Sequence, residues 1–271
     1  MPSQVSQNSA TKNKPSAIWN KPFLKIGHGG AGGHALANSL HSLALALEMG
    51  VDVVEFDVRP CRDALVLLHD DALIKYNHPE ILASQSTLAE LRALETDPER
   101  QVATLEEALD LLKGHALLNV DLKAAGYEAA VLESVTAKGL LGDVIFSSVL
   151  PSSLRFIRQQ EPEVMLGLSY PEDRGNASAK PYLTPIVNSV IAAMRLTLPY
   201  RILSMLANAN ANAVMLYHKV VSRSVIRTVQ HAGGKVFTWT VDVQPRMREL
   251  MKMGVNGITT NYPDLFTPLN H

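Results

Sequence analysis

Strand-like and helix-like segments alternate along almost the whole of this chain. Short apolar runs bounded by turn residues are followed by longer segments with apolar residues at helical spacing. This alternation predicts a parallel sheet covered by helices, because parallel neighbours need a long crossover between them. Strands are expected at 24–28, 51–58, 65–68, 116–122, 144–148, 164–168, 213–217, 236–241 and 257–260. Helices are expected at 38–49, 88–94, 105–113, 127–138, 152–160, 186–206, 222–232 and 245–253.

This strand count favours an α/β fold of the closed (β/α)₈ TIM-barrel type, in which one strand is surplus. The turn at residues 60–64 is too short for a crossover, so the strand at 65–68 should run antiparallel as a small β-hairpin flap above the rim. An open doubly wound sheet is the alternative. The loop at 29–33 lacks the glycine spacing of a dinucleotide-binding loop, which counts against that alternative.

Composition narrows the class of protein further. Hydrophobic residues make up 46 % of the chain, and 25 basic residues face 26 acidic ones. The balanced charge argues against a nucleic-acid partner, since phosphate contacts favour a basic excess. Residues 1–22 are polar and lack a signal-peptide core, so a disordered segment, a single domain over 23–271 and a cytoplasmic location are expected. The single Cys61 excludes an intrachain disulfide and is more typical of a turn or core residue than of a nucleophile.

The most apolar stretch covers residues 183–206. Arg195, Pro199 and Arg201 interrupt it, so it falls short of a membrane-spanning helix. The simplest interpretation is a pair of core-facing helices. The alternative is an apolar lip beside the site, with peripheral membrane contact through 186–206.

Two acidic clusters follow predicted strands. Glu55 and Asp57 are two residues apart, as are Asp121 and Lys123, so each pair points to one face of its strand. Crowded carboxylates repel one another and are tolerated where a hard cation such as Mg²⁺ or Ca²⁺ lies between them. An isolated E-x-D strand is more commonly a solvated sheet edge, so the hypothesis depends on the clusters meeting.

Two histidines are expected at the same place. His28 ends the first strand, and the flap returns His69 towards the strand ends that carry the acids, where barrel active sites lie. A single histidine in either position is usually a hydrogen-bonded turn residue. Together, the residues suggest one divalent cation bound by the three carboxylates. Lys123 would lie on a phosphate, and an imidazole on each side would serve as general acid and base.

These residues resemble the glycerophosphodiester phosphodiesterase family, within the phospholipase-C-like barrels. The similarity runs from about Lys25 to Phe266 and rests on the order and spacing of several short motifs rather than on any one. The motifs are Glu55-Phe56-Asp57-Val58, Leu67-Leu68-His69-Asp70-Asp71, Thr104-Leu105-Glu106-Glu107-Ala108-Leu109, Asn119-Val120-Asp121-Leu122-Lys123, Trp239-Thr240-Val241-Asp242 and the stretch 254–263.

The resemblance implies hydrolysis of small glycerophosphodiester substrates to glycerol 3-phosphate and an alcohol with Mg²⁺ or Ca²⁺, and in some members cleavage of lysophospholipids. It implies His28 and His69 as the acid–base pair. Glu55, Asp57 and Asp121 would be the metal ligands. Lys123 would lie near the phosphate and Trp239 near the glycerol or the leaving group.

Three departures from the family pattern stand out. Gly29 occupies the place of an arginine that could grip the phosphate, and Ala37 replaces a glutamate beside the metal site. Asp121 stands where a longer glutamate is usual. Losing the Arg and the Glu together resembles removal of one neutralising pair, and Arg59, Lys25 or His34 are candidates to restore the charge.

Two other functions remain open from these departures. One is a catalytically degenerate barrel that binds a phosphate or a lipid headgroup. The other is a metal-dependent lyase that acts on a substrate without phosphate, which suits Lys123 beside two rim histidines less well.

Overall fold

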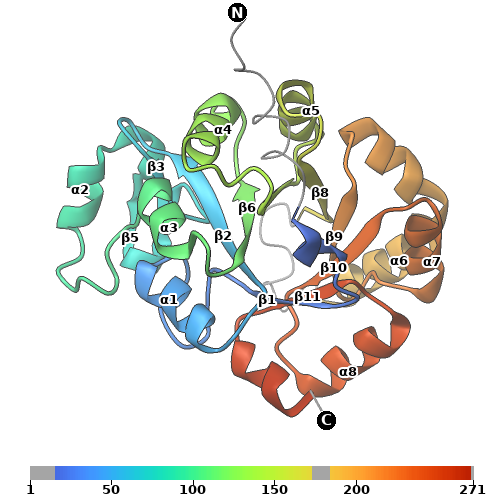
Figure 1. Cartoon of the computed structure of the whole chain (residues 1–271). Helices are drawn as coiled ribbons and strands as arrows, with labels where there is room; N and C mark the ends of the chain where they lie inside the picture. The colour runs from blue at the N-terminus through green and yellow to red at the C-terminus, as the bar shows by residue number, and fades with distance from the viewer. Residues whose placement is uncertain (1–15, 173–183, 270–271) are drawn as a thin grey trace, which may run out of the picture.

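A computed structural model describes residues 16–172 and 184–269 of the chain. Eight parallel strands form a closed barrel, in which β1 pairs with both β2 and β11 (Figure 1). The strands, in barrel order, are β1 (Leu24–Gly27), β2 (Val53–Pro60), β6 (Leu117–Leu122), β7 (Val144–Ser148), β8 (Met165–Tyr170), β9 (Ala213–Tyr217), β10 (Lys235–Trp239) and β11 (Gly257–Thr260). This closure confirms the predicted barrel and excludes the open sheet.

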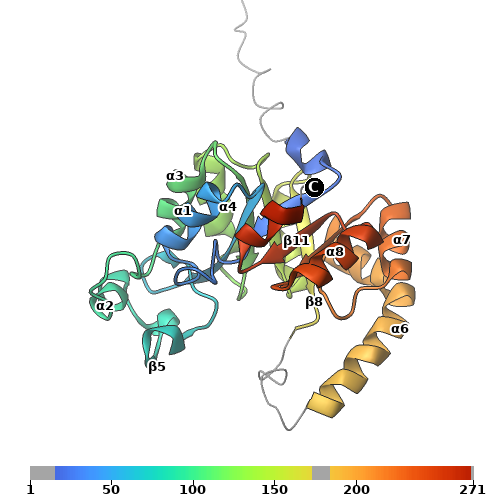
Figure 2. The same cartoon turned by 90° about the horizontal axis from the view of Figure 1, so that it is seen from below.

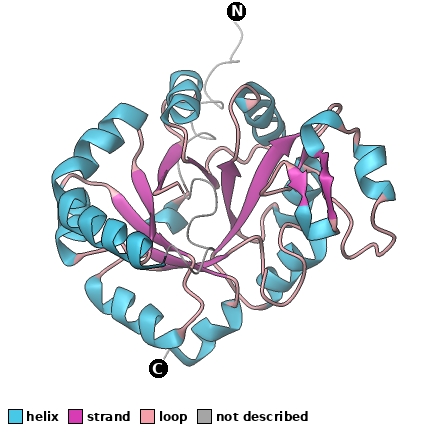
Figure 3. Cartoon of the chain, turned by 180° about the vertical axis from the view of Figure 1, so that it is seen from behind, coloured by secondary structure: helices cyan, strands magenta, loops and turns pink. Residues whose placement is uncertain are grey.

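Helices cover the outside of the barrel, as the view from behind shows (Figure 3). Two of them begin with reciprocal capping boxes, Thr87 with Glu90 and Thr104 with Glu107. The helices are α1 (Leu40–Glu48), α2 (Leu88–Ala93), α3 (Leu105–Leu112), α4 (Glu128–Ala137), α5 (Pro151–Gln160), α6 (Thr184–Ala209), α7 (Arg223–His231) and α8 (Gln244–Met253).

The half of the barrel interior at the amino-terminal ends of the strands is apolar, and residues before β1 close this end. Trp19, on the short 3-10 helix η1 (Ala17–Asn20), is buried, and its indole Nε1 donates to the carbonyl of Gly142 at 3.3 Å. The disordered segment expected over residues 1–22 is therefore wrong for residues 17–20; residues 1–15 lie outside the described residues. The apolar cluster that fills this half of the barrel contains Trp19, Leu24, Ile26, Val53, Leu117, Ile145, Met165, Ala213, Met215 and Phe237.

An insertion, residues 61–103, follows β2. Its first strand, β3 (Leu65–Val66), pairs antiparallel with Arg59 and Pro60 of β2, which confirms the predicted hairpin. The insertion continues through a second small hairpin of β4 (Ala72–Leu73) and β5 (His78–Leu82), which the sequence reading did not identify. It has its own apolar cluster, built from Val66, Leu68, Leu73, Tyr76, Ala83, Leu91 and Val102. This cluster anchors the insertion at one side of the barrel.

Helix α6 is one continuous helix with Pro199 inside it, so the expected pair of helices is wrong. Leu198, Ile202, Leu206 and Ala209 are buried at helical spacing and fix its C-terminal half to the barrel. Its N-terminal half projects past the barrel, on the face that also carries the insertion (Figure 2). By length and composition Val187–Ala209 could cross a membrane, contrary to the sequence expectation; 17 % of its apolar window is buried.

Candidate active site

The half of the barrel interior at the carboxyl ends of the strands is polar, in contrast to the apolar half at their amino-terminal ends. Along β2 the inward residues change from Val53 to Glu55 and Asp57, and along β6 from Leu117 to Asn119 and Asp121. Asp57 and Asp121 are register partners in these neighbouring parallel strands. Because such strands lie about 4.8 Å apart, the two carboxylates meet at the carboxyl end of the barrel.

The structure brings the three predicted acids together. One oxygen each of Glu55, Asp57 and Asp121 lies within 4.8 Å of the others, and all three side chains are buried. Lys123 Nζ lies 2.5 Å from Asp121 Oδ2 and 2.9 Å from Asp57 Oδ1. Four ionisable groups therefore share a space that excludes most water.

This donor set fits a hard divalent cation. Asp57 Oδ1 is buried without a hydrogen-bond partner, since the Lys123 amine beside it forms an ion pair but lacks hydrogen-bond geometry. Buried carboxylate oxygens normally accept a hydrogen bond or ligate a metal. The unpaired oxygen and its two acidic neighbours could hold an ion between them.

Burial and mutual repulsion set the protonation of the site. Burial, followed by the charge of Asp57, raises the pKa of Glu55 well above its usual value. Burial would also raise the pKa of Asp57, but Lys123 and the two histidines outweigh it, so that pKa lies well below its usual value. Burial opposes the charge of Lys123, yet Asp121, Asp57 and Glu55 raise the pKa of its amine above the ordinary range. Of Glu55 and Asp57, Glu55 is the acid whose shifted pKa favours the protonated form when no cation is bound.

His28 lies at the edge of this cluster, on the loop that leaves β1. Its Nε2 is 4.0 Å from Glu55 Oε2, and its Nδ1 is 2.7 Å from Asn261 Oδ1. Burial lowers the pKa of His28 below its usual value, although the nearby Asp57 acts in the opposite direction. A neutral imidazole can accept a proton at neutral pH.

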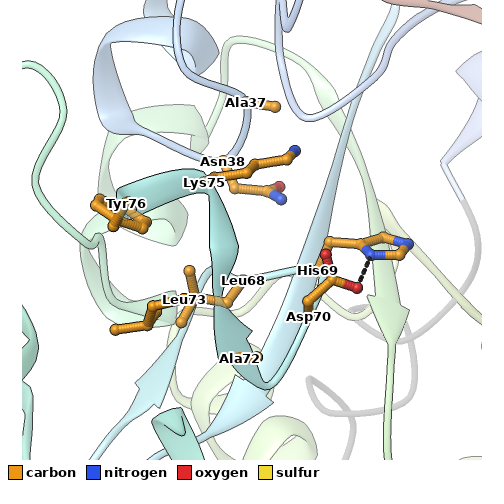
Figure 4. Close-up of a pocket in the computed structure, with 9 residues that line it drawn as sticks. All are labelled: Ala37, Asn38, Leu68, His69, Asp70, Ala72, Leu73, Lys75 and Tyr76. Atoms are coloured by element: carbon orange, nitrogen blue, oxygen red, sulfur yellow. Dashed lines mark hydrogen bonds and ion pairs between the residues drawn. The ribbon is translucent and has the colours of Figure 1, made fainter. Parts of the chain in front are cut away.

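His69 reaches the site from the insertion, as the sequence predicted. Its side chain is 50 % exposed, and Asp70 Oδ1 lies 2.9 Å from its Nδ1 (Figure 4). Arg59 Nε donates to the carbonyl of His69 at 2.8 Å, which fixes the backbone here. The charges of both His28 and His69 lower the pKa of Asp57, so both imidazoles lie near enough to this carboxylate to act on it.

Trp239 is the last residue of β10, and its contact with the glycerol or the leaving group stays a prediction. Its Nε1 donates to the carbonyl of Met215 at 2.8 Å, and its ring centroid is 5.6 Å from that of Tyr217. The ring packs on the apolar interior below. This half-buried aromatic surface could contact the carbon skeleton of a bound molecule.

Sequence reasoning missed Asn38, which it included only as the first residue of the helix expected at 38–49. The cap of α1 is Ser39, whose hydroxyl accepts the N–H of Ser42 at 3.1 Å. Asn38 instead binds Asp57 twice: its Nδ2 donates to Asp57 Oδ2 at 2.8 Å, and its Oδ1 accepts the Asp57 N–H at 3.1 Å. Asn38 adopts a left-handed backbone with φ of 70°, a region that Asn tolerates, and no local sequence signal marked its contact with Asp57.

The two departures at Gly29 and Ala37 lie against each other. A Cβ added at Gly29 would be 2.8 Å from the Ala37 Cβ, and Gly29 adopts a φ of +51°. Its N–H donates to Glu55 Oε2 at 2.8 Å, so the backbone holds the first acid of the cluster. This adjacency is consistent with joint loss of a charge pair.

The candidates for the lost positive charge are otherwise engaged. Arg59 binds the backbone of His69, His34 lies 2.6 Å from Asp264, and Lys25 belongs to the outward face of β1. Lys75, which the sequence reading did not consider, lines a cavity of about 20 Å³ together with Ala37 and His69 (Figure 4). It is the cation that the insertion places nearest to this gap among the described residues lining the cavity.

Relatives of known sequence share the full length of the barrel. Residues 28–265 match the glycerophosphoryl diester phosphodiesterase family. The glycerophosphodiester phosphodiesterase of Bacillus subtilis is 26 % identical, with 90 % of this chain and 85 % of that protein covered. One from Caldanaerobacter subterraneus subsp. tengcongensis is 24 % identical, with 89 % and 95 % covered.

Solved structures share the fold. A phosphodiesterase of Oleispira antarctica, in complex with the product sn-glycerol-3-phosphate, has a TM-score of 0.74 at 22 % identity, covering 92 % of this chain and 97 % of its own. The glycerophosphodiester phosphodiesterase of Thermotoga maritima has a TM-score of 0.69 at 21 % identity, with 91 % and 98 % covered. The chain belongs to the glycerophosphoryl diester phosphodiesterase family of enzymes.

Proposed function

We propose that this protein hydrolyses glycerophosphodiesters to glycerol 3-phosphate and an alcohol, using one divalent cation, Mg²⁺ or Ca²⁺. The observation that carries the proposal is the buried triad of Glu55, Asp57 and Asp121 at the carboxyl end of the barrel, with His28 4.0 Å from Glu55. Family membership and the product named for the Oleispira relative support the substrate class.

The chain's residues then have distinct tasks. When bound by the three carboxylates, the cation supplies charge that favours attack at phosphorus. Lys123, held by Asp57 and Asp121, places a second positive charge next to the phosphate oxygens. One histidine accepts a proton from the attacking oxygen, of water or of the substrate's own glycerol hydroxyl, as the new P–O bond forms, and the other donates a proton to the alcohol oxygen as its bond to phosphorus breaks. Where the glycerol hydroxyl attacks, water then opens the cyclic phosphate with the two histidine roles exchanged, so that either route consumes one water. Trp239 offers its ring to the glycerol or the leaving group.

A substrate panel with and without chelator tests this function. Glycerophosphocholine, glycerophosphoethanolamine and glycerophosphoglycerol should each be assayed for release of glycerol 3-phosphate. Release that EDTA abolishes and excess Mg²⁺ or Ca²⁺ restores is expected. Cation binding without turnover on any of these diesters would instead support the degenerate barrel, which the Gly29 and Ala37 departures motivate.

Cation binding should release a proton. The raised pKa of Glu55 means that the metal-free site holds a proton there, and a ligating carboxylate must lose it. Affinity should therefore rise with pH until the pH exceeds that raised pKa, and fall on acidification. Calorimetry in buffers of different ionisation enthalpy should show up to about one proton released per cation. Glu55→Gln should remove this release, and an affinity independent of pH would contradict the assignment.

We also propose lysophospholipids as substrates, with α6 as a lip that touches a micelle or membrane. Leu196, at the end of the projecting half, is 74 % exposed, and Tyr200, on the outer side of the half that packs on the barrel, is 89 % exposed. The helix carries Arg195 and Arg201 and no acidic residue, a charge pattern suited to an anionic lipid surface. Its place beside the barrel mouth would bring a lipid headgroup to the triad (Figure 2).

Serine substitutions test this lip. L196S and Y200S together should reduce kcat/KM on micellar lysophospholipid by about tenfold, because each loses apolar area that would enter the lipid, and leave soluble glycerophosphocholine unaffected. Phe156→Ser on α5, also an exposed apolar residue, is the matched control. Equal losses on both substrates would contradict the lip.

A further inference from the structure

A chain of hydrogen bonds runs away from the site behind His28. Asn261, after β11, lies 2.7 Å from His28 Nδ1 through its Oδ1 and donates from Nδ2 to Asp242 Oδ2 at 2.7 Å. Asp242 comes from the loop after β10. Its Oδ1 accepts the backbone N–H of Asn261 at 2.9 Å and the hydroxyl of Thr260 at 3.0 Å. Two separate strand ends thus converge on one imidazole.

The direction of each bond in this chain is fixed by chemistry. A carboxylate only accepts, so the NH₂ group of Asn261 must face Asp242. The carbonyl oxygen of the same amide then faces His28, and an oxygen can only accept. His28 must therefore donate from Nδ1, which leaves the lone pair of its neutral ring on Nε2. That nitrogen is the one 4.0 Å from Glu55, on the side of the carboxylate triad.

We infer that Asn261 and Asp242 are positioning residues that hold His28 in the tautomer with its proton on Nδ1. Their side-chain hydrogen bonds go to His28, to Thr260, to the backbone of residue 261 and to each other, so they act through the orientation and tautomer of one ring. The inference rests on the proposed function for its kinetic consequence, but the tautomer itself is a property of the protein without substrate.

Asp242→Asn should reverse the donor and acceptor directions along this series of hydrogen bonds. The backbone N–H of Asn261 and the Thr260 hydroxyl still need an acceptor, so the new amide keeps its oxygen towards them and turns its NH₂ towards Asn261. The Asn261 amide must then present its oxygen to residue 242 and its NH₂ to His28. The His28 ring must then accept a hydrogen bond at Nδ1, so its proton moves to Nε2. An imidazole of that form cannot accept a proton from the reacting group.

The double exchange D242N/N261D restores the pattern. The carboxylate at position 261 accepts from His28 Nδ1 and from the NH₂ group at position 242, while the amide oxygen at 242 still accepts the backbone N–H. Donors and acceptors match at every contact, with the same atoms in almost the same places. The exchange therefore separates tautomer control from a general requirement for Asp242.

Kinetics give the first test. D242N should lower kcat by about 10²-fold, with little change in KM, because a proton transfer is lost while binding is not. The double exchange should recover activity to within about tenfold of the original, since both nitrogens regain their roles. Asp264→Asn is the matched control, because it also removes a carboxylate charge from a rim histidine, His34, outside the site. It should change kcat by less than about twofold.

Nitrogen-15 NMR of the histidine rings gives the second test, independent of turnover. The His28 signals, assigned by their loss in His28→Gln, should show a protonated Nδ1 in the original protein and the double exchange, and a protonated Nε2 in D242N. A protonated Nε2 in the original protein, or a double exchange no more active than D242N, would overturn the inference. If the original protein turns over no diester, the proposed function fails, and the NMR result still decides the tautomer.

Discussion

Replacing His28 or His69 by alanine is expected to reduce glycerol 3-phosphate release by at least about 10³-fold, with cation affinity nearly unchanged. The two rings come from different segments, the loop after β1 and the insertion, so neither can substitute for the other. Each loss removes one proton transfer but none of the three carboxylates. The measurement is kcat on glycerophosphocholine with saturating Mg²⁺, beside a cation titration of the same variant.

His78→Ala is the matched control for this pair. His78 belongs to β5 of the same insertion, where its Nδ1 lies 3.2 Å from Glu80 Oε1. Its replacement should leave kcat within about twofold of the original. Turnover surviving in either His28→Ala or His69→Ala would remove that histidine from the mechanism.

Asp57→Asn is expected to abolish both cation binding and turnover. Asp57 is the centre of the cluster: its Oδ2 accepts from Asn38, and its Oδ1, which accepts no hydrogen bond, forms an ion pair with Lys123. The amide removes one negative charge while Lys123 stays positive, so the lysine repels the incoming metal cation. We expect cation affinity to fall by at least about 100-fold and kcat/KM with it.

Asp110→Asn is the control for that change. Asp110 lies on the outer helix α3, where it pairs with Lys138 at 2.5 Å at the surface, and exposed pairs of this kind contribute little. Its cation affinity and turnover should match the original protein. An Asp57→Asn protein that is folded by circular dichroism and still binds the cation tightly would show that the triad is not the metal site.

The barrel was predictable because its pattern is local. Each strand is a short apolar run, and the short turn before residue 65 could only form a hairpin. The inward carboxylates were visible for the same reason: Glu55 and Asp57 alternate with buried Val54 and Phe56, and this alternation places both acids on one face.

The remaining parts of the site depend on contacts distant in sequence. Asn38 has the local features of a helix cap, and only the approach of β2 shows that it binds Asp57. Asn261 and His28 are 233 residues apart, and nothing near either reveals the bond between them. The continuity of α6 was also not predictable from the sequence, because Pro199 favours a break in the helix. Packing of Leu198 and Ile202 on the barrel overrides that preference.

The most direct test of the central claim is a crystal structure with Mn²⁺ and sn-glycerol 3-phosphate, using the anomalous signal of the metal. The account predicts one strong peak in direct contact with the carboxylates of Glu55, Asp57 and Asp121, with the phosphate beside Lys123 and one imidazole on each side. A peak elsewhere on the protein, with the triad bridged only by Lys123, would contradict it.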